Sequence, residues 1–141
     1  MTPGRRGHRL VPHTADVILE AWGPDLAACC EEAVAALVET YAERTDVEVV
    51  GRRRVRLGPA PGEQLLLDVL DEVIFTLDTS DEVPIAAEVT ASADGGLDVE
   101  LVLAGPDLVG STGAVPKALA RSGLRFESDP GRVSCRVLVD V

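Results

Sequence analysis

Apolar and polar residues alternate in several short stretches of this 141-residue chain, and such alternation is typical of half-buried β-strands. It predicts strands over residues 17–22, 85–93, 97–103 and 133–141, with shorter candidates at 47–50, 54–57 and 124–127. Asp94-Gly95-Gly96 predicts a tight hairpin, and Asp129-Pro130-Gly131 predicts a turn before the last strand. Hairpins between alternating segments favour a mostly antiparallel sheet.

Two segments carry the i, i+3, i+4, i+7 apolar spacing of amphipathic helices. The first starts at Leu26 behind Asp25, a predicted N-cap, and its last apolar position is Tyr41. The second follows the breaker cluster 59–62, and its predicted buried stripe spans positions 66–77. Strands that interleave with two principal helices predict the α+β class.

The chain holds no linker long enough to divide it, so residues 7–141 are expected to form a single domain behind a flexible tail at 1–6. Pro116 to Ser122 is predicted to form a short third helix, since Pro116 suits a first helical position and Gly123 a C-terminal end.

Composition narrows the class of partner. Aromatic residues make up only 3% of the chain, so aliphatic side chains must build its core. The formal net charge of −11 counts against tight nucleic-acid binding and favours a basic protein partner.

No apolar run approaches the roughly 18 residues of a membrane span. The three cysteines form no C-x-x-C pair, so they are predicted to be buried small hydrophobes in a cytoplasmic protein.

Two acids stand at the edges of predicted strands at opposite ends of the chain. Asp16 closes His13-Thr14-Ala15-Asp16, and Asp140 lies in the terminal Val139-Asp140-Val141. Aspartate is a poor strand former, so two of them suggest a shared site if their strands lie side by side. Considered separately, each acid has an ordinary alternative role: Asp16 would cap a turn, and Asp140 would keep the last strand soluble. Two carboxylates and the carbonyl oxygen of Val141 would suit a hard divalent cation whose remaining ligands are water.

Other candidates have competing interpretations. One interpretation gives His13 a function, either to orient Asp16 or to contact a partner. The competing interpretation is an ordinary histidine at a strand edge. Asp68, Asp71 and Glu72 share one side of the second helix. This acidic side is interpreted as a second cation site, as a docking surface for a basic partner, or simply as a solvated helix face. No serine lies in a Gly-x-Ser-x-Gly context and only two histidines are present, so the chain does not read as a self-contained enzyme.

Three anchors in order resemble the archease family: His13-Thr14-Ala15-Asp16, the helical run 65–72, and Val139-Asp140-Val141. The resemblance spans about residues 7–141. It implies a strand–helix–strand–strand module with an inserted segment, and a metal held by Asp16, Asp140 and Val141. Ca²⁺ is the expected ion, with Mg²⁺ or Mn²⁺ as alternatives. Asp71-Glu72 corresponds to an Asn-Glu pair common in the family, which makes Glu72 the better functional candidate of the acidic helix.

Archease-like proteins are accessory factors of a GTP-dependent RNA ligase. That ligase joins ends bearing a 3′-phosphate or 2′,3′-cyclic phosphate to a 5′-hydroxyl, in tRNA splicing and RNA repair. The accessory factor promotes guanylylation of the ligase and its multiple turnover. The resemblance therefore implies a cytoplasmic accessory protein with Asp16 and Asp140 near the ligase's active site.

One segment departs from the family pattern. A family run close to K-A-V-T-Y-H-G-L corresponds here to residues 117–124, in which Lys117 matches while Arg121 and Ser122 replace the tyrosine and histidine. The chain is thus expected to be a divergent member, with His13, Asp71, Glu72 and Lys117 as candidate partner-binding residues. The open alternatives are a protein-binding or chaperone-like module that no longer activates the ligase, and a metal-dependent enzyme, which would need a cleft lined by more than two acids.

Overall fold

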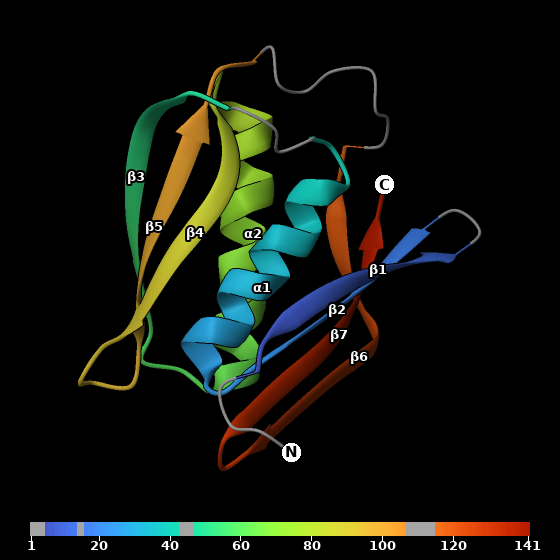
Figure 1. Cartoon of the computed structure of the whole chain (residues 1–141), viewed down its shortest axis with the longest axis vertical. Coiled ribbons are helices and arrows are strands. Elements are labelled where there is room, and N and C mark those ends of the chain that lie inside the picture. Colours follow the sequence, from blue (N-terminus) through green and yellow to red (C-terminus); the bar gives the residue numbers. More distant parts are fainter. Residues whose placement is uncertain (1–4, 14–15, 43–46, 107–114) are drawn as a thin grey trace.

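Two β-sheets and two α-helices make up the protein in a computed structural model that describes residues 5–13, 16–42, 47–106 and 115–141. The elements follow one another in the chain as shown in Figure 1: β1 (Gly7–His13), β2 (Asp16–Gly23), α1 (Leu26–Glu39), β3 (Val49–Leu57), α2 (Gly62–Thr79), β4 (Val83–Ala91), β5 (Leu97–Ala104), β6 (Ala118–Asp129) and β7 (Arg132–Asp140). The predicted α+β class, with two principal helices and mostly antiparallel strands, is confirmed. Among the residues described, no helix is both long and apolar enough to cross a membrane.

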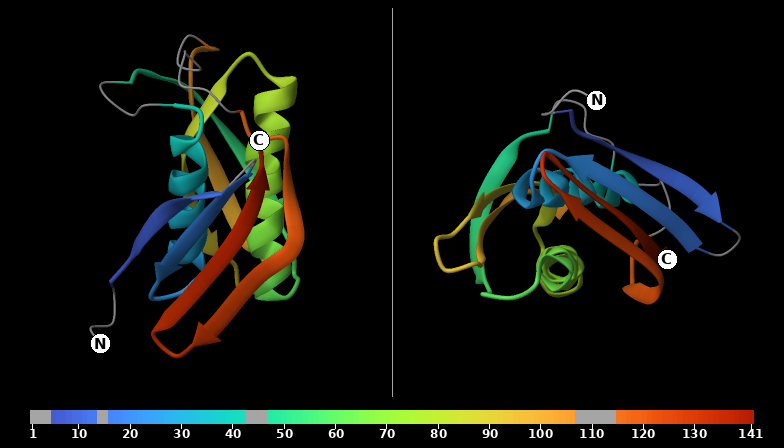
Figure 2. Two further views of the ribbon diagram at one scale, coloured as in Figure 1. Left: turned by 90° about the vertical axis from the view of Figure 1, so that its right-hand side faces the viewer. Right: turned by 90° about the horizontal axis from the view of Figure 1, so that it is seen from below.

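The strands form a four-stranded sheet in the order β1-β2-β7-β6 and a three-stranded sheet in the order β3-β5-β4. Every neighbouring pair is antiparallel. Figure 2 shows the two sheets diverging like the sides of a wedge, with both helices between them. Helix α1 contacts β2 in one sheet and β4 in the other, while α2 packs on α1 and β6. Each sheet therefore buries its inner face against helices and turns its outer face to solvent.

Aliphatic side chains from both sheets and both helices fill the wedge. On β7, Val137 and Val139 are fully buried, whereas the residues that alternate with them are not. On β2, Leu19 and Ala21 occupy the same core. Helix α1 begins as predicted, because the Asp25 carboxylate accepts a hydrogen bond from the Ala28 N–H at 2.8 Å. The strand alternation and the helical stripe were thus read correctly.

The predicted helix from Pro116 to Ser122 is wrong. These residues lead into β6, which pairs with β7 from Ala118 onward. The register shifts between Ala120 and Arg125, and Gly123 within this bulge has a φ of 78°. The exposed backbone edge of β7 offers a hydrogen-bonding partner to this segment, and that tertiary pairing outweighs the modest helix propensity of Lys117 to Ala120.

Strand β3 also differs from the expectation. The two short candidates, split near Gly51, are one strand with a register shift between Val49 and Gly51. A β-bulge accommodates the irregular residue without ending the pairing with β5.

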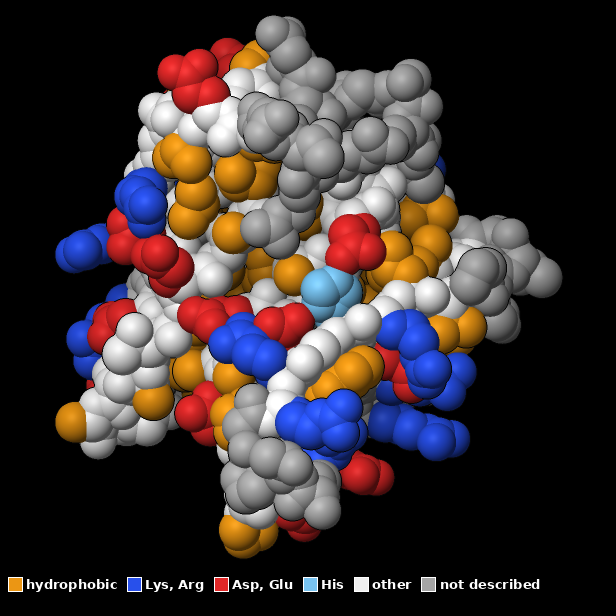
Figure 3. Space-filling view, viewed as in Figure 1, with side chains coloured by type: hydrophobic (Ala, Val, Ile, Leu, Met, Phe, Trp, Pro, Cys, Tyr) orange, Lys and Arg blue, Asp and Glu red, His pale blue; other side chains and the backbone are white. Residues whose placement is uncertain are grey.

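The sequence pattern did not predict β1, the edge strand beside β2. A proline near its end, Pro12, suits an edge position because proline cannot donate to a second neighbour. On the helix side, His8 lies between two carboxylates of α1: its Nδ1 is 2.8 Å from Glu32 Oε1, and its Nε2 is bonded to Glu39. Arg6 adds ion pairs to Glu31 and Glu32. Figure 3 shows the acidic side chains gathered beside a histidine on this face. The cluster ties β1 to α1.

The His8 cluster predicts a pH-dependent stability. Burial alone would lower the pKa of His8, but the hydrogen bonds to Glu32 and Glu39 outweigh it, and the pKa is raised above its ordinary 6.5. Since the folded state binds the proton more tightly, the stabilisation is complete below the unfolded pKa and is lost as pH rises through the folded pKa. We expect the stability advantage of the wild type over His8→Gln to shrink as the pH rises above the ordinary histidine pKa of 6.5.

Urea unfolding of both proteins at pH values below and above this pKa measures the effect, and Arg9→Gln, a change on the same strand that leaves His8 in place, is the control. An NMR titration that gave His8 a pKa at or below 6.5 would contradict the assignment.

Candidate functional site

Asp16 and Asp140 are direct cross-strand partners. Strand β2 runs antiparallel to β7, and its register opposes Asp16 to Asp140 and Val17 to Val139. Opposed residues share a face of the sheet, with Cβ atoms about 4.5–5.5 Å apart. Val139 is fully buried on the inner face, so the alternation assigns both aspartates to the outer face. The sequence-predicted meeting of the two acids is what the register produces.

The same row continues across the neighbouring strands. His13 on β1 opposes Asp16, and Ala118 on β6 opposes Asp140. The N–H of Lys117 donates to the carbonyl oxygen of Asp140 at 2.8 Å. His13 thus occupies a register position beside Asp16, because β1 and β2 pair in an antiparallel sense; Thr14 and Ala15 fall outside the described residues. Lys117 joins the site through its backbone.

The acid pair and the neighbouring backbone supply oxygen donors at this point. Across the described ranges, no group of three or more histidine, cysteine or acidic side chains gathers where it could hold a metal ion. The carbonyl oxygen of the half-buried Val141 follows Asp140 directly along the chain. Carboxylate and carbonyl oxygens are ligands of hard cations such as Ca²⁺ and Mg²⁺, so the residues present fit such an ion better than they fit zinc.

The acidic residues of α2 point to two different neighbours. Glu72 Oε2 lies 3.4 Å from Arg53 Nη2 of β3 and is a buried atom without a hydrogen bond among the described residues. Arg53 also donates to Thr76 Oγ1 at 2.5 Å and lies 5.5 Å from the ring centroid of Phe75. Glu72 therefore helps to tie β3 to α2.

Asp71 instead faces the segment that leads into β6. It lines an open depression of about 460 Å³ together with Ile74, Phe75, Leu77, Asp78, Val115, Pro116 and Lys117. Burial, and then the nearby charges of Asp68 and Glu72, raise the pKa of Asp71 against the opposing effect of Arg121. Two predicted partner-binding residues, Asp71 and Lys117, thus line one depression beside the acid pair.

Sequence reasoning missed the apolar part of this depression. The side chain of Phe75 is 54% exposed and that of Val115 is 41% exposed, although both are large hydrophobic residues. Phe75 falls outside the buried stripe of α2, which was the available signal. Val115 lies in a stretch without apolar periodicity, so no sequence signal pointed to its exposure.

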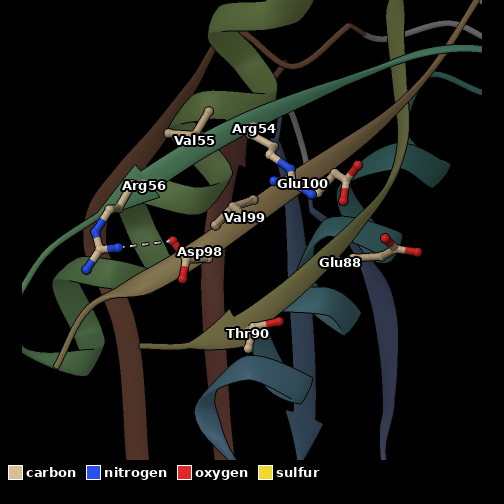
Figure 4. Close-up of a pocket in the computed structure, with 8 residues that line it drawn as sticks. All are labelled: Arg54, Val55, Arg56, Glu88, Thr90, Asp98, Val99 and Glu100. Atoms are coloured by element: carbon tan, nitrogen blue, oxygen red, sulfur yellow. Dashed lines mark ion pairs between the residues drawn. The ribbon is translucent and has the colours of Figure 1, made fainter. Parts of the chain in front are cut away.

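A larger depression, of about 620 Å³, lies on the outer face of the three-stranded sheet (Figure 4). Most of its charged residues are paired: Arg56 lies 3.0 Å from Asp94 and 3.7 Å from Asp98, and Arg52 lies 3.1 Å from Glu88 and 3.7 Å from Glu100. Arg54, which also lines the depression, has no ion-pair partner among the described residues. Because these ion pairs neutralise one another and lie on the other sheet, they add nothing to the acid pair.

Comparison with known proteins places this geometry in a family. The sequence model of the archease protein family (MTH1598/TM1083) matches residues 8–141, nearly the whole chain. A probable protein archease of Mycobacterium tuberculosis is 38% identical over 135 residues, covering 96% of this chain and 75% of that protein. A protein archease of Pyrobaculum neutrophilum is 30% identical, covering 84% of this chain and 85% of that protein.

Solved structures have the same fold. The solution structure of Methanobacterium thermoautotrophicum protein 1598 has a TM-score of 0.71 at 27% identity, covering 96% of this chain and 99% of that one. The crystal structure of an archease, possible chaperone, from Thermotoga maritima has a TM-score of 0.67 at 20% identity, covering 93% and 94%. At that identity, the second likeness concerns the fold alone.

The opposed aspartates predict an electrostatic cost in the metal-free protein. Like charges directly opposite one another destabilise a sheet, so Asp140→Asn should raise the free energy of unfolding by about 0.2–1 kcal/mol at neutral pH with a chelator present. Urea denaturation at low and high salt measures it, and added salt should reduce the gain. Asp78→Asn on α2 is the matched control. A loss of stability in Asp140→Asn would mean that the carboxylate has a stabilising partner.

Proposed function

The chain belongs to the archease family, and from that membership we propose that it is an accessory protein of a GTP-dependent RNA ligase. In this role it promotes guanylylation of the ligase and repeated turnover in the joining of RNA ends, during tRNA splicing or RNA repair. The observation that carries the proposal is the register that opposes Asp16 to Asp140, since these are the acids of the two motifs that resemble the family. A cytoplasmic setting agrees with three free, buried cysteines.

Asp16, Asp140 and the backbone oxygen of Val141 would hold the divalent cation, with water as the remaining ligands. Ca²⁺ fits such a loose oxygen set best, because it tolerates irregular geometry, whereas Mg²⁺ and Mn²⁺ are the alternatives. The cation would supply positive charge at the point where the ligase's active site docks. The protein's own residues position that point: β2 and β7 hold the acids, and the Lys117 N–H fixes the carbonyl of Asp140.

The depression on α2 is the proposed contact surface for the ligase. It adjoins the acid pair through Lys117 and offers the exposed side chains of Phe75 and Val115. Exposed apolar side chains rimmed by charge are typical of protein interfaces. The net charge of −11 would steer the encounter with a basic, RNA-binding enzyme.

A second candidate function is a protein-binding or chaperone-like module of the same fold. Two observations favour it: Arg121 and Ser122 replace the tyrosine and histidine of the family run, and both are exposed on β6. The Thermotoga maritima structure carries the description possible chaperone. Under this alternative, the α2 depression would bind a partner other than the ligase.

Multiple-turnover RNA ligation by the host's ligase tests the primary proposal. We expect the wild-type chain to raise the number of turnovers per ligase, and Asp16→Ala and Asp140→Ala each to abolish the stimulation, because each removes one of two carboxylate ligands. Asp94→Ala, on the hairpin of the other sheet, should stimulate like the wild type. Equal guanylylation of the ligase with and without the chain would favour the second candidate.

Cation binding has its own readout, independent of the ligase. A ligand that binds only the folded state stabilises it by about 2.7 kcal/mol at 100 times its dissociation constant. Millimolar Ca²⁺ should therefore raise the melting temperature of the wild type by several degrees and leave Asp16→Asn and Asp140→Asn unchanged. Asp78→Asn should respond as the wild type does. An equal rise in all four proteins would place the cation elsewhere.

A further inference from the structure

The outer face of the four-stranded sheet carries a second charged row, parallel to that of the acid pair. Arg9 opposes Glu20, Glu20 opposes Arg136, and Arg136 opposes Arg125, so one row crosses β1, β2, β7 and β6. Glu20 and Arg136 lie four residues along their strands from Asp16 and Asp140, a distance of about 13 Å at about 3.3 Å per residue. An even number of residues keeps both rows on the outer face.

Glu20, the single acidic residue of this row, forms its ion pair with Arg9. Arg9 donates from Nε to Glu20 Oε1 at 2.8 Å, and its Nη2 lies 2.7 Å from the same oxygen. Within the described part of the chain, no carboxylate lies within ion-pair distance of Arg125 or Arg136. The two arginines therefore occupy opposed positions on β6 and β7, and although Glu20 and Glu127 border the same surface, neither forms an ion pair with them. Like charges at opposed positions cost stability. An anion between them would remove that cost.

The space beside the two arginines is shaped to receive a ligand. They line an open depression of about 280 Å³ together with Ile18, Ser122, Gly123 and Leu138. The bulge of β6 opens it, because residues 121–124 lack register partners on β7. A Cβ placed on Gly123 would meet nothing within 4 Å, so the bulge does not close over the depression. Ile18 and Leu138 supply an apolar floor on the side toward the acid pair.

We propose that Arg125 and Arg136 bind the phosphate group of a nucleotide, whose sugar or base lies on Ile18 and Leu138. The planar fork of guanidinium donors matches the oxygens of a phosphate bidentately, and two such forks suit a dianionic phosphate. Water takes about 30 Å³ per molecule in the liquid, so 280 Å³ accommodates a phosphate and part of a nucleoside. An acidic peptide would use the charges but not the apolar floor.

The phosphate can come from two sources of the same chemistry, the end of an RNA chain or a free nucleotide. A ligand anchored at the arginines extends over Ile18 and Leu138 toward Asp16 and Asp140. This binding site lies outside the acid pair and outside the α2 depression. It goes beyond the proposed ligase-accessory function and does not require it.

Isothermal titration calorimetry of the full chain at low salt tests the site without any ligase present. The probes are a short oligoribonucleotide with a 3′-phosphate, the same oligoribonucleotide with a 3′-hydroxyl, guanosine monophosphate, and a glutamate-rich peptide. We expect Arg125→Gln and Arg136→Gln each to weaken nucleotide binding at least about tenfold, since each loses charge-assisted hydrogen bonds.

Arg54→Gln is the matched control, because Arg54 is another exposed arginine without an ion-pair partner among the described residues, on the outer face of the other sheet. It should bind like the wild type. Melting temperatures check the fold, and neither variant of the pair should be less stable than the wild type, since each removes a repulsion.

The pattern among the probes identifies the source. Preference for the 3′-phosphate RNA assigns the RNA end, equal binding of the two RNAs assigns an internal phosphate, and equal binding of guanosine monophosphate assigns a free nucleotide. Each of these binding patterns supports the proposed site only if the Arg125→Gln and Arg136→Gln variants both lose the binding. No nucleotide binding, binding that neither substitution weakens, or peptide binding as tight as the RNA's would overturn the proposal, whatever the ligase assay gives.

Discussion

The antiparallel register between β2 and β7 is the constraint on which the rest of the molecule depends. A shift of one residue would turn every side chain of a strand to the opposite face. Burial forbids that shift, because Leu19 on β2 and Val137 on β7 are opposed and both fully buried. The aliphatic core therefore sets the positions of Asp16 and Asp140. The site is precise because the hydrophobic alternation behind it is strict.

The sequence predicted those parts of the fold whose pattern is repeated and local. Both helices and the last strand were found because their apolar spacing persists over several turns or pleats. The second half of β6 was predicted as a strand at 124–127, but its first half was misread as a helix because only the pairing with β7 decides its conformation. Strand β1 was missed because Pro12 and the polar residue His8 interrupt the alternation. The two aspartates were proposed to meet, but a register is a property of two strands together and follows from neither alone. The Arg125–Arg136 pair was invisible for the same reason.

Net charge is a poor guide to the local chemistry of this surface. A total of −11 argues against non-specific attraction to a polyanion, since the field of the whole protein repels it. That field does not forbid one phosphate from binding between two unpaired guanidinium groups, where the interaction is short-ranged and its counter-charge is absent. Elsewhere, arginines such as Arg52 and Arg56 are neutralised by carboxylates within 4 Å. What distinguishes the proposed binding site is the opposition of two unpaired arginines beside the apolar side chains of Ile18 and Leu138, not the local density of positive charge.

The departure from the family pattern and the arginine depression lie at the same place. Ser122, which stands where the family run has histidine, lines the depression with Arg125 and Arg136, and Gly123 follows it in the bulge. The bulge residues have no register partners on β7, so they can change without disturbing the core. A bulky ring at position 122 would border the depression that serine leaves open. We therefore expect a larger residue at this position to narrow access to the arginines and to leave the register of β2 and β7 unchanged.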